Sequence, residues 1–521
     1  MRRPPSHRVV IADPLAPDGP GRLREAGCAV VDATGLDRHG LTAALAGADA
    51  LVVRSRTRVD PKLLDAGERL RVVARAGVGI DNIAVDEATR RGILVVNVPS
   101  GNLLSAAEHT FALLLALARN VDSASHSLAA GAWHRDRFVG TELHAKTLGI
   151  VGLGRIGRKV AVRARAFGMK IVAHDPHLDR EVAAELGIPL LGLDDVLRRA
   201  DVITLHVPLD EGTRGFLGAD ELRRMRPGGL LVNCARGGLV DEDALLESLE
   251  SGHLGGAALD VFAEEPPGDH TPGRALIRHP RVVATPHLGA QTHEAKRRVS
   301  ARVARIVLDA LDGSPAVPAV NLPFAWDEEW DPRYLGLAET LGRLSAALFG
   351  AAARTVELGV CGIEDGLERP LALAAGRGVL ASSLGLAASY VDVERLLAER
   401  GIRLELGSCP PWGRERPGHD ALVSVTVGDG AGGEPIDAAG TLTHGSRPRV
   451  VRFGGAPIEL SPDGRLLVIR SSDQPGLVGS IGTLLGEAAV NIADAHLGRE
   501  RSADDAWTVL RLDQNPDDET L

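Results

Sequence analysis

Aromatic residues, cysteines and long apolar runs are all scarce in this sequence of 521 residues. Only 3% of the residues are aromatic while 61 are glycine, a balance that predicts aliphatic packing and many tight turns. The longest uninterrupted apolar run is Phe111–Ala118, which is far too short to span a membrane. The N-terminal stretch also lacks the apolar segment of a secretion signal. We therefore expect a cytoplasmic protein that makes no contact with a membrane.

The few cysteines are widely separated and form no Cys-x-x-Cys pair. They are Cys28, Cys234, Cys361 and Cys409. Scattered cysteines of this kind are typical of proteins in a reducing compartment, whereas disulfide frameworks and zinc knuckles use closely spaced sets. We expect no disulfide framework and no metal site.

Positive charge is not in excess, since the formal net charge is −10. Proteins that bind nucleic acid normally carry a concentrated basic face, so this balance argues against a nucleic-acid partner. Anionic small molecules are still suitable ligands, because a few arginines can reverse the field inside one cleft. A chain of 521 residues is also too long for one hydrophobic core, and we expect three or four domains.

Short apolar strands alternate with helical patterns over the first hundred residues, and a second series of the same kind starts at Lys146. Apolar strands separated by helices are typical of parallel α/β sheets. The sequence therefore predicts two doubly wound parallel-sheet domains, one flavodoxin-like and one Rossmann-like, with a long helix running from Asn102 to about Asn120. Their expected limits are residues 1–97 with 291–318 for the first, and residues 98–290 for the second.

The C-terminal part has a different organisation. Residues 317–323 (VPAVNLP) are typical of a linker, and residues 319–455 alternate apolar patterns with loop-rich breaks. We expect an intervening α/β or β-rich domain there. The tail, residues 465–521, carries its own strand–turn–helix–strand pattern.

A glycine-rich motif follows the first strand of the second series. Gly152, Gly154 and Gly157 stand in the order Gly-x-Gly-x-x-Gly, with Arg155 and Ile156 between the last two. Such glycines permit a tight turn, close approach to a pyrophosphate and packing of helix against strand. Asp175 ends the next strand, where a carboxylate binds the adenosine ribose and repels a 2′-phosphate. The motif predicts an NAD site.

Three polar side chains follow later strands of the same series. Hydride transfer to a 2-keto acid needs a group that anchors the carboxylate, a proton donor for the carbonyl oxygen and a partner for that donor. Arg236, His287 and Glu265 are of the types that suit these needs, and each follows a predicted strand. Because ligands bind at the carboxyl ends of strands in open α/β sheets, we expect the three to form a catalytic site.

Seven motifs spread over about residues 50 to 295 strengthen this interpretation. They are RSRT, RAGVGIDN, SGNLLSAAEHT, GLGRIG, NCARGGLVDEDAL, GAALDVFAEEPP and TPHLGAQT. Together they resemble the D-isomer-specific 2-hydroxyacid dehydrogenase family and, within it, the long-form D-3-phosphoglycerate dehydrogenases. The resemblance implies NAD-dependent oxidation of a D-2-hydroxy acid to a 2-keto acid and the reverse. The expected substrate is 3-phosphoglycerate, as in the first step of L-serine biosynthesis.

The resemblance also implies roles for individual residues. Arg236 would bind and polarise the keto acid, His287 would be the general acid and base, and Glu265 would be its partner, while Asp260 would face the nicotinamide carboxamide. The other residues expected to line the cofactor cleft are Val207, Cys234, Ala235, Leu288, Gly289 and Ala290. Val78 and Val207 stand where many relatives have threonine, and both are expected to contact ligand through the backbone.

A phosphorylated substrate needs cationic donors outside the catalytic centre. Arg54 and Arg75 both end predicted strands of the first domain and could meet a phosphate across the cleft. The resemblance implies substrate contacts for Arg54, Arg75, Val78, Gly79 and Asn102. Trp133 and Arg135 match a segment that packs on the partner subunit in relatives, which implies a homodimer or homotetramer.

Other functions fit the same motifs. Hydroxypyruvate, glyoxylate or 2-oxoglutarate reductases and D-lactate dehydrogenase share the catalytic set but usually lack long C-terminal additions. Relatives of this fold also serve as NAD-sensing corepressors, which are binding proteins. Turnover by the purified protein distinguishes these alternatives.

The tail resembles an ACT domain, a small ferredoxin-like unit that binds amino acids. By that resemblance Asp473 and Asn491 would hold the effector L-serine. The sequence ends at residues 518–521 (Asp-Glu-Thr-Leu), where a second helix and a last strand are expected, so the unit looks incomplete.

Overall fold

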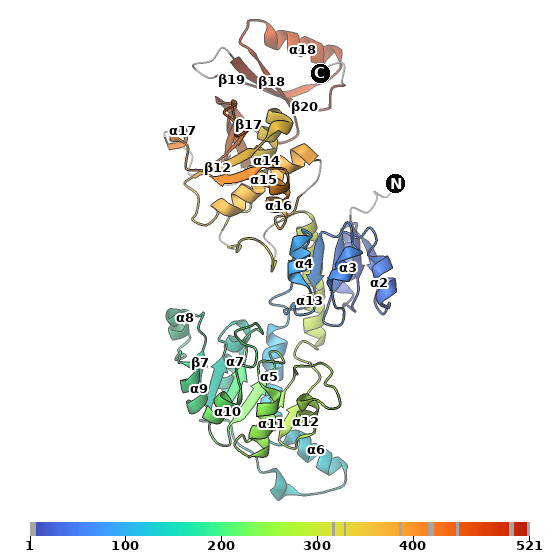
Figure 1. The fold of residues 1–521 in the computed structure, drawn as a ribbon, viewed down its shortest axis with the longest axis vertical. Coiled ribbons are helices and arrows are strands. Elements are labelled where there is room, and N and C mark those ends of the chain that lie inside the picture. Colours follow the sequence, from blue (N-terminus) through green and yellow to red (C-terminus); the bar gives the residue numbers. More distant parts are fainter. Residues whose placement is uncertain are drawn as a thin grey trace.

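The computed structural model describes residues 7–314, 318–327, 330–384, 388–414, 421–443, 447–499 and 505–517. Val317, where the predicted linker begins, and residues 518–521 lie outside them. The strands form four sheets, of which the first lies between the second and the third in the elongated molecule (Figure 1). Among the described residues, no helix has both the length and the apolar character needed to cross a membrane. The α/β class predicted from the sequence is confirmed.

The first sheet is fully parallel, with strand order β2-β1-β3-β4-β5. This is the flavodoxin-like order that the sequence predicts. The strands are β1 (Arg8–Ile11), β2 (Ala29–Asp32), β3 (Ala50–Val53), β4 (Val72–Arg75) and β5 (Leu94–Val96). The helices between them are α1 (Asp18–Glu25), α2 (Arg38–Ala44), α3 (Pro61–Asp65) and α4 (Val85–Arg90). One face packs on α1 and on the much later α13 (His293–Leu311), so the chain returns to the first sheet after the second is complete.

The second sheet is also fully parallel, with order β11-β10-β9-β8-β6-β7. A single parallel bridge from Ala173 to Leu190 occupies the place of a further strand beside β7, which completes the Rossmann order. The strands are β6 (Thr147–Val151), β7 (Lys170–His174), β8 (Val202–Leu205), β9 (Leu230–Asn233), β10 (Gly256–Leu259) and β11 (Val282–Ala284). The helices are α5 (Leu103–Ala118), α6 (Val121–Ala129), η1 (Arg135–Phe138), α7 (Arg155–Ala166), α8 (Arg180–Glu185), α9 (Leu193–Arg199), α10 (Ala219–Arg224), α11 (Glu242–Glu250) and α12 (Pro272–Arg278). The long helix predicted after Asn102 is α5.

The third sheet is mixed, with order β13-β12-β14-β15-β16-β17, and only β12 and β13 pair in parallel. Its helices α14 and α15 cross closely, because a Cβ at Gly378 would lie 1.9 Å from the carbonyl oxygen of Glu339. The strands are β12 (Thr355–Cys361), β13 (Arg403–Leu406), β14 (Leu422–Gly428), β15 (Ile436–Thr443), β16 (Arg447–Phe453) and β17 (Ala456–Leu460). The helices are α14 (Arg333–Phe349), η2 (Gly350–Ala352), α15 (Glu368–Leu384), α16 (Val393–Glu399) and α17 (Pro411–Arg414).

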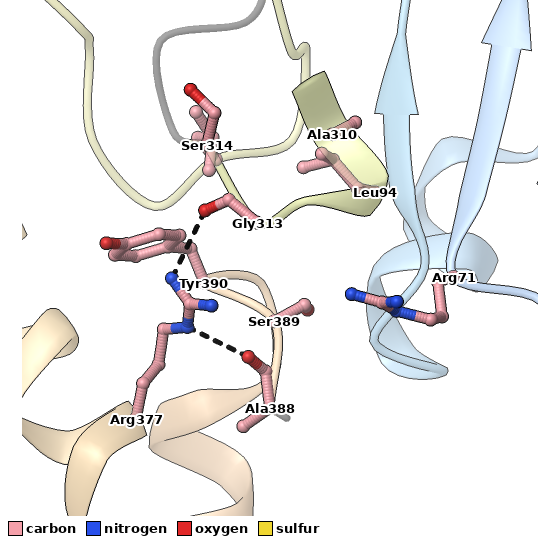
Figure 2. A pocket seen from close by; sticks show the side chains of 10 residues that line it. Arg71, Leu94, Ala310, Gly313, Ser314, Arg377, Ala388, Ser389 and Tyr390 are labelled. Carbon is pink, nitrogen blue, oxygen red and sulfur yellow. Dashed lines mark hydrogen bonds between the residues drawn. The ribbon is translucent and has the colours of Figure 1, made fainter. Parts of the chain in front are cut away.

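A buried arginine joins the third unit to the first. The guanidinium of Arg377 donates to the carbonyl of Ala388 at 2.9 Å and to that of Gly313, just beyond α13, at 3.3 Å (Figure 2). It also stacks 4.3 Å from the ring centroid of Tyr390. Because Gly313 follows the helix that packs on the first sheet, this contact fixes the third unit against the first.

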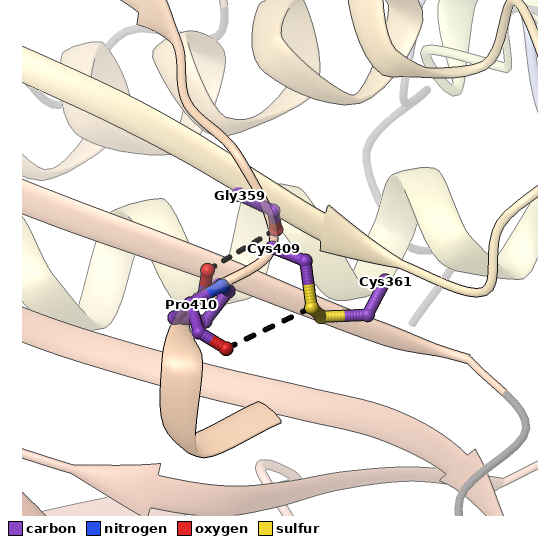
Figure 3. Close-up of a disulfide and its surroundings, with 5 residues drawn as sticks. Gly359, Cys361, Cys409 and Pro410 are labelled. Atoms are coloured by element: carbon purple, nitrogen blue, oxygen red, sulfur yellow. Dashed lines mark hydrogen bonds between the residues drawn. A yellow bond between two sulfur atoms is a disulfide. The ribbon is translucent and has the colours of Figure 1, made fainter. Parts of the chain in front are cut away.

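The cysteine prediction is wrong at one pair. Cys361 and Cys409 form a disulfide, with their Cα atoms 5.0 Å apart (Figure 3). Cys361 ends β12 and Cys409 follows β13, and the parallel pairing of these strands brings the two cysteines together although 48 residues separate them. Cys28 and Cys234 are free.

The tail forms a small antiparallel sheet of order β18-β20-β19 with one helix. Its elements are β18 (Arg465–Ser472), α18 (Leu477–Glu487), β19 (Ile492–Arg499) and β20 (Asp505–Leu512). One face of the sheet packs on α18, and the other places Trp507 in the core of the third unit. The Nε1 of Trp507 donates to the carbonyl of Gly454 at 2.9 Å, which holds the tail sheet to the loop between β16 and β17.

Candidate active site

The glycine-rich loop after β6 has the geometry that a dinucleotide requires. Gly152 has a φ of +93°, and a Cβ there would lie 2.6 Å from a backbone carbonyl oxygen. A Cβ at Gly157 would lie 2.1 Å from the carbonyl oxygen of Gly152, so glycine alone lets α7 start this close to β6. At Gly154 a Cβ would meet nothing within 4 Å, so this position opens onto free space at the amino end of α7. That helix begins at Arg155, and Ile156 is its second residue.

Asp175 lies directly against this loop. Its Oδ2 accepts a hydrogen bond from the backbone N–H of Leu153 at 2.9 Å, and its Oδ1 accepts one from that of His177 at 3.0 Å. The two bonds fix a negative charge beside the glycine-rich turn. The loop and this carboxylate together fit NAD, because they offer open space and backbone donors to the pyrophosphate and an acceptor to the ribose.

Two further groups at this edge of the sheet are uncharged at neutral pH. Burial raises the pKa of the Cys234 thiol to about 12, with a further contribution from Asp260, so it stays protonated at neutral pH. Burial lowers the pKa of His206 to about 4, and its Nε2 lies 3.0 Å from the Thr204 hydroxyl oxygen. His206 is therefore unsuited to proton transfer. Of the other predicted lining residues, Val207 is close to Gly152 and Ala235 follows Cys234 in the turn after β9.

Arg236, Glu265 and His287 follow the adjacent strands β9, β10 and β11 at one edge of the second sheet. The Nδ1 of His287 lies 2.8 Å from Oε2 of Glu265, and Oε1 of Glu265 accepts from the backbone N–H of Phe262 at 3.1 Å. The His287 side chain is 42% exposed, so a ligand can reach it. The structure thus brings the predicted acid–base pair together.

The loop that carries His287 is anchored on Asp260, whose residue is only 1% exposed. The backbone N–H of His287 donates to the Asp260 carbonyl at 2.8 Å. The next two amides donate to the Asp260 carboxylate, Leu288 to Oδ1 at 2.7 Å and Gly289 to Oδ2 at 2.9 Å. Burial alone would raise the pKa of Asp260, but hydrogen bonds from His109, Thr285 and this loop outweigh it and lower the pKa. The cofactor contact expected of Asp260 stays a prediction.

Arg236 reaches across the cleft to the first sheet. Its Nε donates to Oδ2 of Asp81 at 3.2 Å. A Cβ at Gly79 would lie 2.0 Å from Nη2 of Arg236 and 2.8 Å from Nη1 of Arg75, so the two guanidinium groups converge on the backbone at Gly79. The Nε and Nη1 of Arg75 are buried and have no hydrogen-bond partner among the described residues. Burial, and then the charge of Arg236, lowers the pKa of Arg75 to about 10, so it is still a cation at neutral pH.

Arg54 and Asn102 line a neighbouring cavity of about 190 Å³ together with Gly77, Ala290 and Lys296. The Oδ1 of Asn102 is buried there, and no described residue forms a hydrogen bond with it. The predicted substrate position Val78 lies beside this cavity, and its carbonyl accepts from Nδ2 of Asn97 at 2.6 Å.

The two predicted effector residues lie in the tail unit. Asp473 follows β18 and pairs with Arg499, while Asn491 precedes β19 and its Nδ2 donates to Oδ2 of Asp513 at 2.6 Å. Asp473 is thus engaged with the last residue of β19, and Asn491 with the residue that follows β20. Groups of His, Cys, Asp or Glu able to hold a metal ion do not occur in the part of the chain that the structure describes.

Sequence reasoning missed three residues of the site. Asp81 contacts Arg236, and His109 and Thr285 contact Asp260. All three stand inside the motifs RAGVGIDN, SGNLLSAAEHT and TPHLGAQT, so the signal was a polar side chain within a motif that had no role assigned to it.

Comparison with known proteins agrees with this geometry. Residues 111–289 match the model of the NAD-binding domain of D-isomer specific 2-hydroxyacid dehydrogenases. The chain is 43% identical to the D-3-phosphoglycerate dehydrogenase of Mycobacterium leprae, over 97% of this chain and 94% of that protein. The chain belongs to the D-isomer-specific 2-hydroxyacid dehydrogenase family.

Other members of this family are similar over different lengths. The D-3-phosphoglycerate dehydrogenase of Bacillus subtilis is 39% identical over 91% of this chain and 89% of its own. The structure of the Aquifex aeolicus D-lactate dehydrogenase, complexed with NAD and lactic acid, is 29% identical with a TM-score of 0.53, and covers 59% of this chain and 96% of that one. As a member of the family, the chain is an NAD-dependent oxidoreductase.

Proposed function

We propose that this protein oxidises D-3-phosphoglycerate to 3-phosphohydroxypyruvate with NAD and catalyses the reverse reaction. The observation that carries the proposal is the meeting of Arg75 with Arg236 at Gly79, where a second cation, with buried Nε and Nη1, lies beside the arginine that would anchor the carboxylate. The similarity to D-3-phosphoglycerate dehydrogenases extends over nearly the whole chain, including the third and fourth sheets.

The residues of the cleft divide the work of the reaction. The cofactor, when bound, would accept the hydride as NAD+ during oxidation and supply it as NADH during reduction. Arg236 offers a planar fork to the substrate carboxylate, and it must exchange its contact with Asp81 for that ligand. His287 gives a proton to the carbonyl oxygen during reduction and takes it from the hydroxyl during oxidation. Glu265 holds Nδ1 of His287, which keeps the other ring nitrogen in place and stabilises the imidazolium.

The phosphate would be bound on the side of the first sheet. Among the described residues, Nε and Nη1 of Arg75 have no hydrogen-bond partner, and Arg54 lines the adjacent cavity together with Asn102. Two cations close to each other repel in the absence of a ligand, and the pKa of Arg75 is lowered first by burial and then by the charge of Arg236. An anion that carries both a carboxylate and a phosphate relieves this repulsion at two points, whereas an unphosphorylated keto acid relieves it at one.

The direct test is NADH oxidation by the purified protein with a panel of keto acids. The panel contains phosphohydroxypyruvate, hydroxypyruvate, glyoxylate, pyruvate and 2-oxoglutarate at equal concentration. We expect kcat/KM to be highest for phosphohydroxypyruvate. A higher value for any other member would assign a different D-2-hydroxy acid, and NADH binding without turnover of any member would favour a binding protein of the corepressor type.

We also propose that the protein acts as a homodimer or homotetramer in the cytoplasm. Trp133 is 76% exposed, and Val121 and Leu128 of the neighbouring helix α6 are more than half exposed. Exposed apolar side chains in and just after α6 are suited to contact with a second copy of the chain. Light scattering of wild type and of Trp133→Glu tests this, and a monomeric wild type would refute it.

The tail is proposed to bind L-serine through Asp473 and Asn491. The amino and carboxylate groups of serine need polar partners of this kind, and the effector must favour one conformation of the enzyme to slow turnover. Calorimetric titration with L-serine, repeated on Asp473→Ala and Asn491→Ala, tests the assignment. Heat of binding in the wild type that is lost in both variants is the expected result, and the absence of binding in the wild type would refute it.

A further inference from the structure

We infer that His109 is a positioning residue for hydride transfer, acting through Asp260 on the loop that carries His287. His109 lies on α5, which packs across β9, β10 and β11 of the second sheet. Its Nε2 is 3.1 Å from Oδ1 of Asp260 and 3.1 Å from the hydroxyl oxygen of Thr285. The inference rests on the role proposed above for His287.

The hydrogen-bond directions in this cluster follow from the chemistry of its members. The pKa of Asp260 is lowered, so its carboxylate is ionised and can only accept. Thr285 therefore gives its single proton to Oδ1 of Asp260 across 2.5 Å. The proton between His109 and Asp260 must then reside on Nε2 of His109, where it also points at the free lone pairs of Thr285.

These two side chains restrain the Asp260 carboxylate in addition to the amides of the catalytic loop. Oδ1 receives His109, Thr285 and the amide of Leu288, and Oδ2 receives the amide of Gly289. A carboxylate held by the two loop amides alone could rotate about its χ angles and carry the loop with it. With His109 and Thr285 in place, the two amides meet a carboxylate of fixed orientation.

The catalytic loop needs such an anchor because its conformation is an uncommon one. His287 has a φ of +56°, in the left-handed region that residues other than glycine rarely adopt. Three successive amides, those of residues 287 to 289, are held on Asp260, one on its carbonyl and two on its carboxylate. Asp260 thereby fixes the backbone that positions the His287 imidazole. His109 stabilises this backbone indirectly, through its hydrogen bond to Asp260.

The test compares variants of His109 with a matched control in the same domain. His109→Leu removes the donor. His109→Gln keeps an amide N–H near the position of Nε2, whereas the shorter side chain of His109→Asn places its N–H too far from Asp260 to bond. The control is His253→Leu, since Nε2 of His253 lies 3.1 Å from the carbonyl oxygen of Leu222 and its side chain has no hydrogen bond to residues 285–289 in the described part of the chain. All are assayed with NADH and the keto acid that the wild type reduces best.

We expect His109→Leu and His109→Asn to lower kcat by about 10- to 100-fold, since misplacing a reacting group by about 1 Å costs this much. Their Kd for NADH should stay within about twofold of the wild type, and His109→Gln should recover most of the loss. With deuterium at the transferred position of NADH, the isotope effect on kcat should rise in the impaired variants, because hydride transfer becomes slower than product release. Should His109→Leu not fold, the comparison of Gln with Asn decides alone.

His253→Leu should lower Tm without changing kcat or the isotope effect. Equal kcat values for the Gln and Asn variants, or an isotope effect that does not move, would overturn the inference. His287→Ala is included in the series to separate it from the proposed function. If that variant keeps its activity, the role of His287 fails, whereas if it is inactive and the His109 variants behave like His253→Leu, only the positioning role fails.

Discussion

The Nε of Arg236 and Oδ2 of Asp81 meet at 3.2 Å, and this contact joins the second sheet to the first across the active-site cleft. The Asp81 carboxylate thus holds the arginine fork that a substrate carboxylate requires. The two side chains are 27% and 53% exposed, so water screens their attraction. The pair can therefore be displaced by a ligand of the same chemistry.

Asp81→Asn should lower KM for the keto acid and leave kcat nearly unchanged. Exposed ion pairs contribute roughly 0.2–1 kcal/mol, so the expected decrease in KM is about 1.5- to 5-fold. Steady-state kinetics at low ionic strength measures it. Asp86→Asn, which removes the same charge from an exposed site on α4, is the control. An increase in KM would mean that Asp81 helps to bind the substrate instead of competing with it.

His287→Ala should reduce kcat by roughly 100- to 10,000-fold, the usual contribution of general acid–base catalysis. The Kd for NADH, measured by fluorescence, should be unchanged, because the glycine-rich loop is not touched. A variant that kept most of its turnover would exclude His287 as the proton donor.

Glu265→Gln should shift the pH profile of kcat/KM rather than abolish activity. The amide can still bond to Nδ1 of His287 but no longer compensates the charge of the imidazolium. The limb of the profile that reports on the protonated ring should therefore move to lower pH. Profiles of wild type and variant in one buffer series decide this, and superimposable limbs would contradict the pairing.

Asp175→Ala should weaken the binding of NAD and relax the discrimination against NADP. The carboxylate is held beside the glycine-rich turn by two backbone amides, so its charge is fixed where a 2′-phosphate would lie. The ratio of kcat/KM for the two cofactors measures the effect. An unchanged ratio would show that the preference for NAD resides in other residues.

Arg75→Met should stabilise the fold and weaken the binding of the phosphorylated substrate. A lowered pKa means that the folded protein binds the Arg75 proton less tightly than the unfolded chain does, so the cation destabilises the fold at every pH below about 10. The free energy of unfolding of the wild type should accordingly rise as the pH increases from about 10 toward the pKa that Arg75 has in the unfolded chain. Removing the cation should raise the free energy of unfolding at neutral pH by about 1–3 kcal/mol.

The same variant should raise KM for phosphohydroxypyruvate by about 10- to 150-fold, the range for a charge-assisted hydrogen bond of roughly 1.5–3 kcal/mol. KM for hydroxypyruvate should change little. Arg56→Met, an exposed neighbour of Arg54 in the same motif, should alter neither quantity. Equal losses on the two substrates would place Arg75 at the carboxylate instead of the phosphate.

Replacing Cys361 and Cys409 by alanine should destabilise the third unit. Closing a loop of 48 residues limits the unfolded chain by about 4 kcal/mol in the chain-entropy model, and measured values are commonly about 2–4 kcal/mol. In calorimetry, the unfolding transition of the third unit should occur at a lower temperature in the variant than in the wild type. Reduction of the wild type with dithiothreitol should reproduce this shift. Cys28→Ala controls for the loss of a thiol. No difference between oxidised and reduced protein would contradict a stabilising disulfide.

Much of the active site could be predicted from the sequence because its signals are local. The glycines at 152, 154 and 157 follow a strand and open a helix, and close backbone approaches permit nothing larger at two of them. Arg236, Glu265 and His287 follow strands that proved to be adjacent and parallel, so their position at the ends of strands was enough to bring them to one edge. A parallel sheet converts spacing along the chain into proximity.

Other features depended on contacts that no local pattern specifies. The pairs Arg236–Asp81 and His109–Asp260 are separated by 155 and 151 residues, and the first of them needs one sheet docked against another. The Asp260 carboxylate receives four donors from two segments of the chain, α5 and residues 285–289. The distant cysteines meet because β12 and β13 pair in parallel. The sequence by itself determined which groups stand at the ends of strands, and only the tertiary structure decided which of them touch, because hydrogen bonds and disulfides form within a few ångströms whatever the length of chain between them.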